Sequence, residues 1–118
     1  MEPMLQFFVM VDSEMSRERM IAGVLEAFPE ARPHKAYSCD IRGNLLQVVA
    51  NRDADPSLAD DPEDGFLYFT WEVDCIPQRG DLDEDHQLVL ARDLQRHFAA
   101  TGARTAVGAS FEDRLQTG

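Results

Sequence analysis

Two carboxylates, Glu72 and Asp74, are the strongest candidates for chemistry in this sequence. They stand two positions apart in a segment with the apolar alternation of a β-strand, and residues i and i+2 of a strand point to the same face, about 7 Å apart. A pair of this kind can share a hydrated cation or contact a sugar. The simpler interpretation, which we weigh beside it, is an acidic face in contact with solvent.

A second acidic run, Asp81-Leu-Asp-Glu-Asp85, resembles the start of a calcium-binding loop. An EF-hand loop requires glycine at its sixth position and glutamate at its twelfth, where this sequence has His86 and Arg92. The EF-hand interpretation therefore fails. A nonspecific divalent-cation site among these acids remains an alternative, and we assign no metal ligand.

Cys39 and Cys75 are the two thiols of the chain. Both fall on expected inner faces of strands, where a free cysteine is usually a small buried apolar side chain. There is no Cys-x-x-Cys motif, and His34, His86 and His97 lack the paired spacing of zinc ligands. The sequence also has no serine elbow and no glycine-rich phosphate loop. We therefore expect no catalytic residue, no metal and no cofactor, and we favour a protein that is not an enzyme.

The first half of the chain predicts a strand, a helix and a hairpin. Residues 4–11 are apolar at odd and even positions alike, which is typical of a central strand covered on both faces. A helix follows from the N-cap Ser16 until a proline interrupts it. Residues 35–41 and 45–50 then form two strands, joined by a turn in which Gly43 supplies a positive φ.

The second half predicts an acidic loop, a strand, a helix and a final strand. Residues 53–65 hold six acids and two prolines, with Leu58 as the expected apolar anchor, so we expect a mobile loop. Residues 66–76 alternate as the clearest strand of the chain. The acids at 81–85 fall in the first turn of a second helix, where they favour the helix macrodipole. Residues 104–110 form the last strand.

These elements follow in the order β-α-β-β-β-α-β within a single domain, residues 1–118, of which 115–118 are expected to be frayed. Two amphipathic helices and a mostly antiparallel sheet of about five strands pack most simply as a two-layer α+β sandwich, with both helices on one face. The plan resembles the ferredoxin-like arrangement with an extra strand. Ferredoxin-like domains include enzymes, regulators, immunity proteins and structural modules, so the resemblance does not select a function.

Covering one face of this sheet with helices leaves an apolar set on the other face. The set consists of Phe8, Met10, Phe66, Tyr68 and Ile76. Monomers rarely expose such a patch to water. We therefore expect a two-fold homodimer through this face, with cover by a loop or the C-terminal tail as the alternative.

The charge distribution is the most informative feature of the sequence. The chain of 118 residues has a formal net charge of −11, and residues 53–85 alone hold twelve acids and one base. Such a field disfavours nucleic acid and anionic membranes as partners. Because no apolar run is long enough for a membrane span or a signal peptide, we expect a cytoplasmic protein. Ten of the eleven bases are arginine, which favours a bacterial gene with GC-rich codons.

We therefore expect a small acidic protein-binding module that masks a basic partner, as an antitoxin or immunity protein does. An acidic surface accelerates association with a cationic protein. The expected contact residues are Asp60, Asp61, Glu63, Asp64, Glu72, Asp74, Asp81 and Asp83. The alternative is a dimeric ferredoxin-like enzyme or small-ligand-binding domain, with a pocket between sheet and helices lined by Trp71, Tyr37 and His97.

Overall fold

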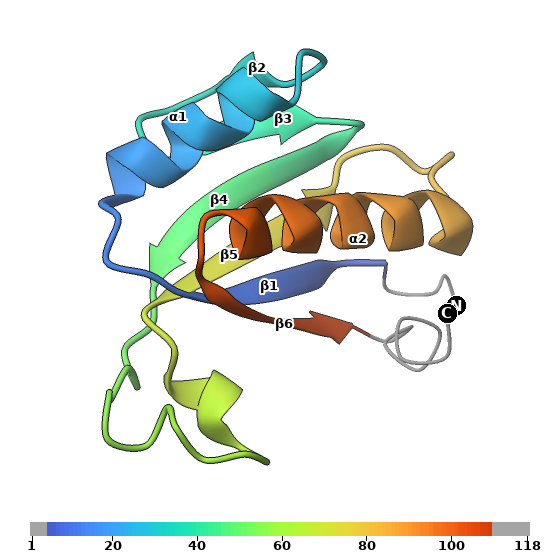
Figure 1. Ribbon diagram of the computed structural model, residues 1–118. Coiled ribbons are helices and arrows are strands. Elements are labelled where there is room, and N and C mark those ends of the chain that lie inside the picture. The colour runs from blue at the N-terminus through green and yellow to red at the C-terminus, as the bar shows by residue number, and fades with distance from the viewer. Residues whose placement is uncertain (1–4, 110–118) are drawn as a thin grey trace.

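The structure, a computed structural model, describes residues 5–109. Within them, a six-stranded antiparallel sheet carries two helices, α1 (Arg17–Ala27) and α2 (Glu84–Ala100), on one face (Figure 1). The strands are β1 (Phe7–Asp12), β2 (Arg32–Pro33), β3 (Ser38–Ile41), β4 (Asn44–Ala50), β5 (Trp71–Pro77) and β6 (Arg104–Ala109), in the order β2-β3-β4-β5-β1-β6. A short 3-10 helix, η1 (Gly65–Tyr68), precedes β5. The α+β class is confirmed, and the arrangement is compatible with a two-layer sandwich.

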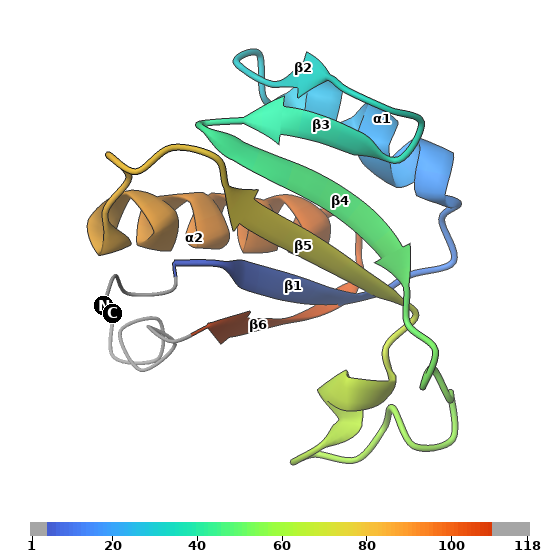
Figure 2. The same cartoon turned by 180° about the vertical axis from the view of Figure 1, so that it is seen from behind.

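The sheet has one strand more than the sequence predicted. The additional strand is β2, in which Arg32 pairs with Asp40 and Pro33 pairs with Cys39. It forms the edge of the sheet beside β3 (Figure 2). A segment of two residues has no readable alternation, so its pairing was not visible in the sequence.

β1 is a central strand, as its apolar residues predicted. It pairs with β5 on one side and with β6 on the other. Phe7, Val9 and Val11 point toward the helices and are at most 1% exposed. Phe8 and Met10 point to the opposite face, which we call the outer face of the sheet.

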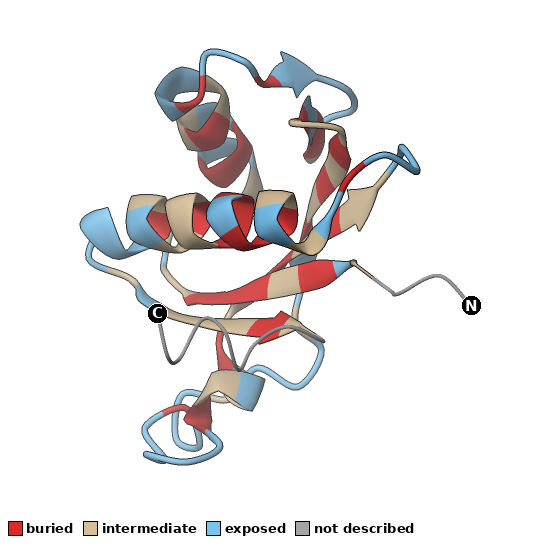
Figure 3. Cartoon of the chain, turned by 90° about the vertical axis from the view of Figure 1, so that its right-hand side faces the viewer, coloured by how far each residue is buried: buried red, intermediate tan, exposed pale blue. Residues whose placement is uncertain are grey.

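α1 begins after the predicted N-cap Ser16, whereas α2 begins at Glu84, so Asp83 is its N-cap and only Glu84 and Asp85 of the acids at 81–85 lie in its first turn, which corrects the prediction. The Ser16 hydroxyl accepts a hydrogen bond from the Arg19 N–H, and the Asp83 carboxylate accepts one from the His86 N–H. α1 buries Met20, Ile21 and Val24, and α2 buries Gln87, Leu88, Leu90, Ala91, Leu94 and Phe98. These side chains and the inner faces of the strands form the main core (Figure 3).

The hairpin between β3 and β4 turns through two residues of positive φ, Arg42 at 47° and Gly43 at 81°. This confirms the predicted turn, although Asn44 already belongs to β4. The Arg42 guanidinium lies 2.7 Å from the carboxylates of both Glu30 and Asp93. The backbone carbonyl of Arg42 accepts a hydrogen bond from His86 Nε2 at 2.7 Å. Contacts from the segment after α1 and from α2 therefore hold the turn.

A buried amide pair joins β4 to α2. Gln87 Nε2 donates to Asn44 Oδ1 at 2.8 Å and to the Leu5 carbonyl at 3.0 Å, while Asn44 Nδ2 donates to Gln87 Oε1 at 2.9 Å. Both side chains are at most 1% exposed. A reciprocal pair of this kind satisfies the buried polar atoms and fixes the helix against the hairpin.

The strand predicted over residues 66–76 begins only at Trp71, which corrects the prediction. The Asn51 side-chain amide donates to the carbonyls of Leu67 and Phe69, at 2.9 and 2.7 Å, so these carbonyls do not take part in a strand ladder. In a strand over residues 66–76, Leu67 and Phe69 would lie on the same inner face as Val73. Instead Leu67 is exposed, and Phe69 is buried beside Met10 on the outer face.

Candidate functional site

The segment of residues 51–64, which contains most of the acidic loop, and η1 lie beyond the end of β4 and the start of β5 (Figures 1 and 2), and their side chains pack on the outer face of the sheet. Buried Met10, Ala59 and Phe69 form a second small core, against which Phe8, Phe66, Tyr68 and Ala106 pack. Part of the expected apolar set is therefore covered by the chain itself. The homodimer through Phe8, Met10, Phe66, Tyr68 and Ile76 stays a prediction, although Met10 is only 4% exposed and can contribute little to it.

Arg104 fixes the loop to the sheet, and Gly65 lets the loop pack closely against η1. Arg104 at the start of β6 donates to the Ala59 carbonyl at 3.2 Å, and its guanidinium lies 2.9 Å from Asp60 and 2.6 Å from Asp12. A Cβ at Gly65 would overlap the same Ala59 carbonyl, so glycine permits this close approach of two backbone segments. The apolar anchor is Ala59, at 3% exposure, and not the predicted Leu58, which is 45% exposed. The mobility expected for residues 53–65 stays a prediction.

A cavity of about 360 Å³ lies between the folded-back loop and strands β1 and β5. We call it the outer groove, and its lining residues are Phe8, Met10, Asn51, Asp53, Leu67, Tyr68 and Glu72. Its size falls in the range of roughly 300 to 1,000 Å³ that is usual for small-ligand sites. Apolar and aromatic side chains line most of it, and Glu72 and Asp53 add two carboxylates.

Glu72 and Asp74 point to the outer face, as their spacing predicted. Burial, a hydrogen bond with Glu72 and the negative charge of Glu72 together raise the pKa of Asp74 to about 7, and burial is the largest of the three causes. The cross-strand neighbours of Asp74 are Phe8 and Gln47, and those of Glu72 are Met10 and Val49. None of these four neighbours is charged, so no cationic side chain on the adjacent strands offsets the charge of the pair. The pair therefore keeps a proton near neutral pH.

The geometry of this pair does not suit a two-carboxylate hydrolase. Glycosidases hold their two carboxyl groups about 5 Å or more apart, because the sugar or a water molecule must fit between them. Glu72 and Asp74 are hydrogen-bonded to each other, which brings the carboxyls closer than that and closer than their spacing along the strand suggested. The pair acts as one compact anionic group.

The acids predicted to bind a partner do not gather at one place, and four of them make contacts within the fold. Asp60 binds Arg104, and Asp81 lies 3.3 Å from Arg79. Asp61 accepts hydrogen bonds from the N–H groups of Glu63 and Asp64, and Asp83 caps α2. Glu63 and Asp64 have exposed side chains. Of the eight predicted acids, only Glu72 lines the outer groove.

The second carboxylate of the groove, Asp53, was not among the predicted residues. Its N–H donates to Asn51 Oδ1 at 3.1 Å, in the manner of an Asx turn. The sequence Asn51-x-Asp53 was the available signal, because asparagine frequently starts such turns. What the sequence could not show is that this turn faces β5.

The two thiols are buried, as predicted, and do not face each other. Cys39 pairs with Leu46 across β3 and β4, and Leu46 pairs with Cys75 across β4 and β5. A whole strand therefore separates the cysteines, which puts their Cα atoms roughly 9–10 Å apart, beyond the reach of a disulfide. Burial raises the pKa of Cys39 to about 11 and also raises that of Cys75, so neither is a reactive thiolate.

The three residues expected to line a pocket between sheet and helices contact different parts of the structure. Trp71 Nε1 donates to the Met15 carbonyl at 3.0 Å. The His97 ring lies against Phe28 and Phe98, with centroids 5.7 and 4.9 Å away, and burial lowers its pKa. The third of these residues, Tyr37, lines a separate cavity.

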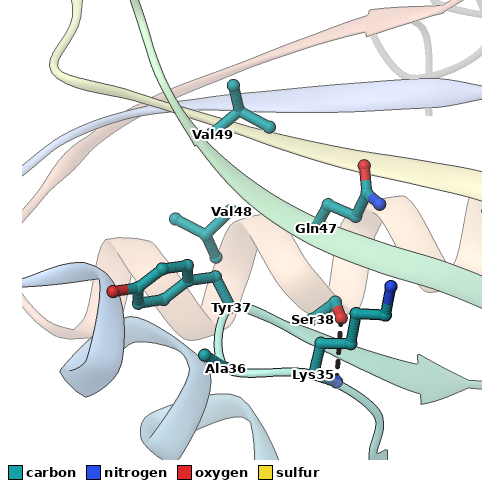
Figure 4. A pocket seen from close by; sticks show the side chains of 7 residues that line it. All are labelled: Lys35, Ala36, Tyr37, Ser38, Gln47, Val48 and Val49. Atoms are coloured by element: carbon teal, nitrogen blue, oxygen red, sulfur yellow. Dashed lines mark hydrogen bonds between the residues drawn. The ribbon is translucent and has the colours of Figure 1, made fainter.

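That second cavity, of about 260 Å³, lies over β4 and the segment before β3 (Figure 4). Tyr37, Lys35, Ala36, Ser38, Gln47, Val48 and Val49 line it. The Ser38 hydroxyl accepts a hydrogen bond from the Lys35 N–H at 3.1 Å and is bonded to the His34 ring at 2.9 Å. Its polar groups are therefore partly used within the chain, and it offers fewer contacts to a ligand than the outer groove does.

Between residues 5 and 109, no three histidine, cysteine, aspartate or glutamate side chains lie close enough together to hold a metal ion. The helices in this part of the chain are also too short or too polar to cross a bilayer.

No protein-family model, curated protein or solved structure matches this chain.

Proposed function

We propose that this protein is a small cytoplasmic binding module that masks a basic protein partner, in the manner of an antitoxin or an immunity protein. The observation that supports the proposal is the concentration of charge, since residues 53–85 contain twelve acids and one base. A strongly acidic surface steers a cationic protein toward itself and repels nucleic acid.

The acidic segment extends along β5 from one end of the sheet to the other. The acidic loop precedes the strand, Glu72 and Asp74 lie on it, and residues 81–85 follow it at the start of α2 (Figure 2). The seven residues of β5 span roughly 23 Å at 3.3 Å per residue. The acids are thus spread over a length closer to that of a protein contact than to that of a small molecule.

Within residues 5–109, three arginines with ion pairs show that some of these acids are neutralised by the fold. Arg104 binds Asp60 and Arg79 binds Asp81, whereas Arg42 binds acids outside the segment. Glu63, Asp64, Glu72 and Asp74 are not among the acids that these arginines bind. They are the acids we expect a partner to contact.

We also propose that the fold is a ferredoxin-like plan with added strands. When β2 and β3 at the sheet edge are set aside, the remaining elements follow as β1-α1-β4-β5-α2-β6. This is the β-α-β-β-α-β order of ferredoxin-like domains. In this proposal β2 and β3 extend the sheet on the side of β4.

The function is tested with the genes that flank this one. Each flanking gene is expressed alone and together with this gene, and growth is measured. We expect one neighbour to encode a basic protein that is toxic alone and harmless when co-expressed, and we expect the purified pair to associate about tenfold more slowly in high salt than in low salt. If no flanking product forms a complex with this protein, or if association does not depend on salt, the masking proposal is wrong.

A further inference from the structure

We propose that the outer groove binds an arginine side chain of the basic partner, with the guanidinium against Glu72 and Asp53 and the methylene stem against Phe8 and Tyr68. The inference rests on the proposed function, because it names the part of the partner that this site takes.

The chemistry of the lining selects this kind of ligand. Phe8, Met10, Leu67 and Tyr68 present apolar or aromatic surface, while the carboxylate of Glu72 lies in the same cavity. A ligand that satisfies both has a cation at the end of an apolar stem, which among protein side chains means lysine or arginine. Arginine is favoured because its planar guanidinium stacks on aromatic rings and binds carboxylates through two hydrogen bonds.

The size of the groove fits one side chain and not a folded element. Its volume is about 360 Å³. A single turn of helix, about 10 Å wide and 5.4 Å high, occupies roughly 420 Å³ and would not enter. The occupant is therefore a side chain that projects from the surface of the partner.

The groove also lacks a positive charge of its own. The cross-strand neighbours of Glu72 are Met10 and Val49, which are uncharged. Arg104, which fixes the loop near the groove, is already bound by Asp12 and Asp60. A half-buried carboxylate without a counter-charge is unfavourable, and a cation from outside removes this penalty.

The two walls of the groove are fixed before any ligand arrives. The Asn51 amide donates to the Leu67 and Phe69 carbonyls, and the Asp55 N–H donates to the Tyr68 carbonyl at 3.1 Å, so the loop is fixed to η1. On the sheet side, the Phe8 ring lies over Gly108, where a Cβ would overlap it. A preformed site loses little conformational entropy on binding.

The inference is tested by NMR with defined probes and without any partner. N-acetyl-arginine amide is titrated into isotope-labelled protein at low salt, beside N-acetyl-citrulline amide, which has nearly the same shape and no charge. We expect the arginine probe to shift the amide signals of Phe8, Tyr68 and Glu72, and the citrulline probe to bind at least tenfold more weakly. Equal binding of the two probes, or shifts located elsewhere, would overturn the inference.

Matched variants separate a local site from general electrostatics. At pH 8, above the pKa of about 7 for Asp74, Glu72→Gln should weaken the arginine probe by about tenfold, as expected for the loss of one charge-assisted contact of about 1.4 kcal/mol. Glu63→Gln removes the same charge from an exposed loop position outside the groove and should change binding less than twofold. If the two variants weaken binding equally, the acidic field alone attracts the probe and the groove is not a site. Asp53→Asn serves as a second groove variant should Glu72→Gln fail to fold.

This inference and the proposed function fail separately. If a basic partner is found and binds Glu72→Gln as tightly as the natural chain, the masking function stands and the groove has no part in it. If the arginine probe binds in the groove and no flanking gene yields a partner, the groove stands as a cation site and the masking function is wrong.

Discussion

The substitution Asp74→Asn should stabilise the folded protein most at pH 8 and have its smallest effect near pH 4, close to the ordinary pKa of the carboxyl. Asp74 is half-buried and hydrogen-bonded to Glu72, and its pKa is about 7. Above that pH both carboxyls are ionised and repel each other, with no charged cross-strand neighbour to compensate. Asparagine keeps the shape of the side chain and removes the charge.

The sign and size of this effect follow from proton linkage. In the folded chain the pKa of Asp74 is about 7, compared with an ordinary value of 3.8. Between these values the folded state holds a proton that the unfolded state has lost, so this contribution is fully present at low pH and disappears as the pH rises past about 7. At 1.36 kcal/mol per pH unit the full difference is about 4 kcal/mol. Because the pair is half-exposed, solvent screening reduces the expected effect to about 1–2 kcal/mol.

Urea unfolding of the natural chain and the variant at several pH values between about 4 and 8.5 measures this effect. The stability of Asp74→Asn relative to the natural chain should grow over that range, with a rise of about 4 °C in Tm per kcal/mol. Glu63→Gln, which removes an exposed charge, should show no such growth. If both variants have the same pH dependence, or if the Asp74 carboxyl titrates below pH 5 in a carbon-13 NMR experiment, the pair does not share a proton and the reasoning is refuted.

Three further predictions concern the loop, the core and the groove. Gly65→Ala should destabilise the fold by about 2 kcal/mol and make the acidic loop more sensitive to limited proteolysis, because its Cβ would overlap the Ala59 carbonyl; unchanged proteolysis would contradict this close contact. Gln87→Ala should cost about 3 kcal/mol in urea unfolding, since it leaves buried polar atoms unsatisfied; Gln95→Ala in the same helix should cost less than about 0.5 kcal/mol. The arginine probe should bind more tightly at pH 8 than at pH 6, because a cation beside Glu72 favours the ionised pair; tighter binding at pH 6 would exclude contact with the pair.

Local rules predicted most elements of this fold because each left a local signal. The hydroxyl of Ser16 and the carboxylate of Asp83 cap the two helices, and a two-residue turn with Gly43 closes the hairpin. The apolar residues at both odd and even positions of β1 correctly indicated a strand covered on both sides. Such signals depend on neighbours a few positions away, and tertiary contacts rarely override them when caps and periodicity agree.

The start of β5 could not be predicted, because the residue that shortens this strand lies far from it in the sequence. Residues 66–76 alternate without a break, and nothing in them indicates that the first five lie outside the strand. The cause is Asn51, whose amide takes the carbonyls of Leu67 and Phe69 from a distant point in the chain. A side chain that competes for backbone carbonyls across such a separation has no local signature.

Strand geometry predicts one wall of the candidate site, and only the folded loop creates the other wall. The period of two placed Glu72 and Asp74 on one face, and that part of the prediction is confirmed. The facing wall, with Tyr68 and Asp53, exists because the loop folds back and fixes itself through Ala59. No pattern in the loop's acids indicated this, since a run of like charges predicts solvation and repulsion.

The contacts made by the acids explain why counting charges was a poor guide to the binding residues. Asp61 and Asp83 accept backbone hydrogen bonds, and Asp60 holds the loop through Arg104, so these carboxylates stabilise the fold that presents the others. Glu72 differs from them because it lies on a central strand, where the backbone is fixed on both sides by β4 and β1. A charge on a rigid strand keeps its position when a ligand arrives, whereas a charge on a loop tip must be ordered at an entropic cost. If the acidic field brings a basic partner to this surface, it is therefore Glu72 on the sheet, more than the denser charge of the loop, that determines where the partner's side chain binds.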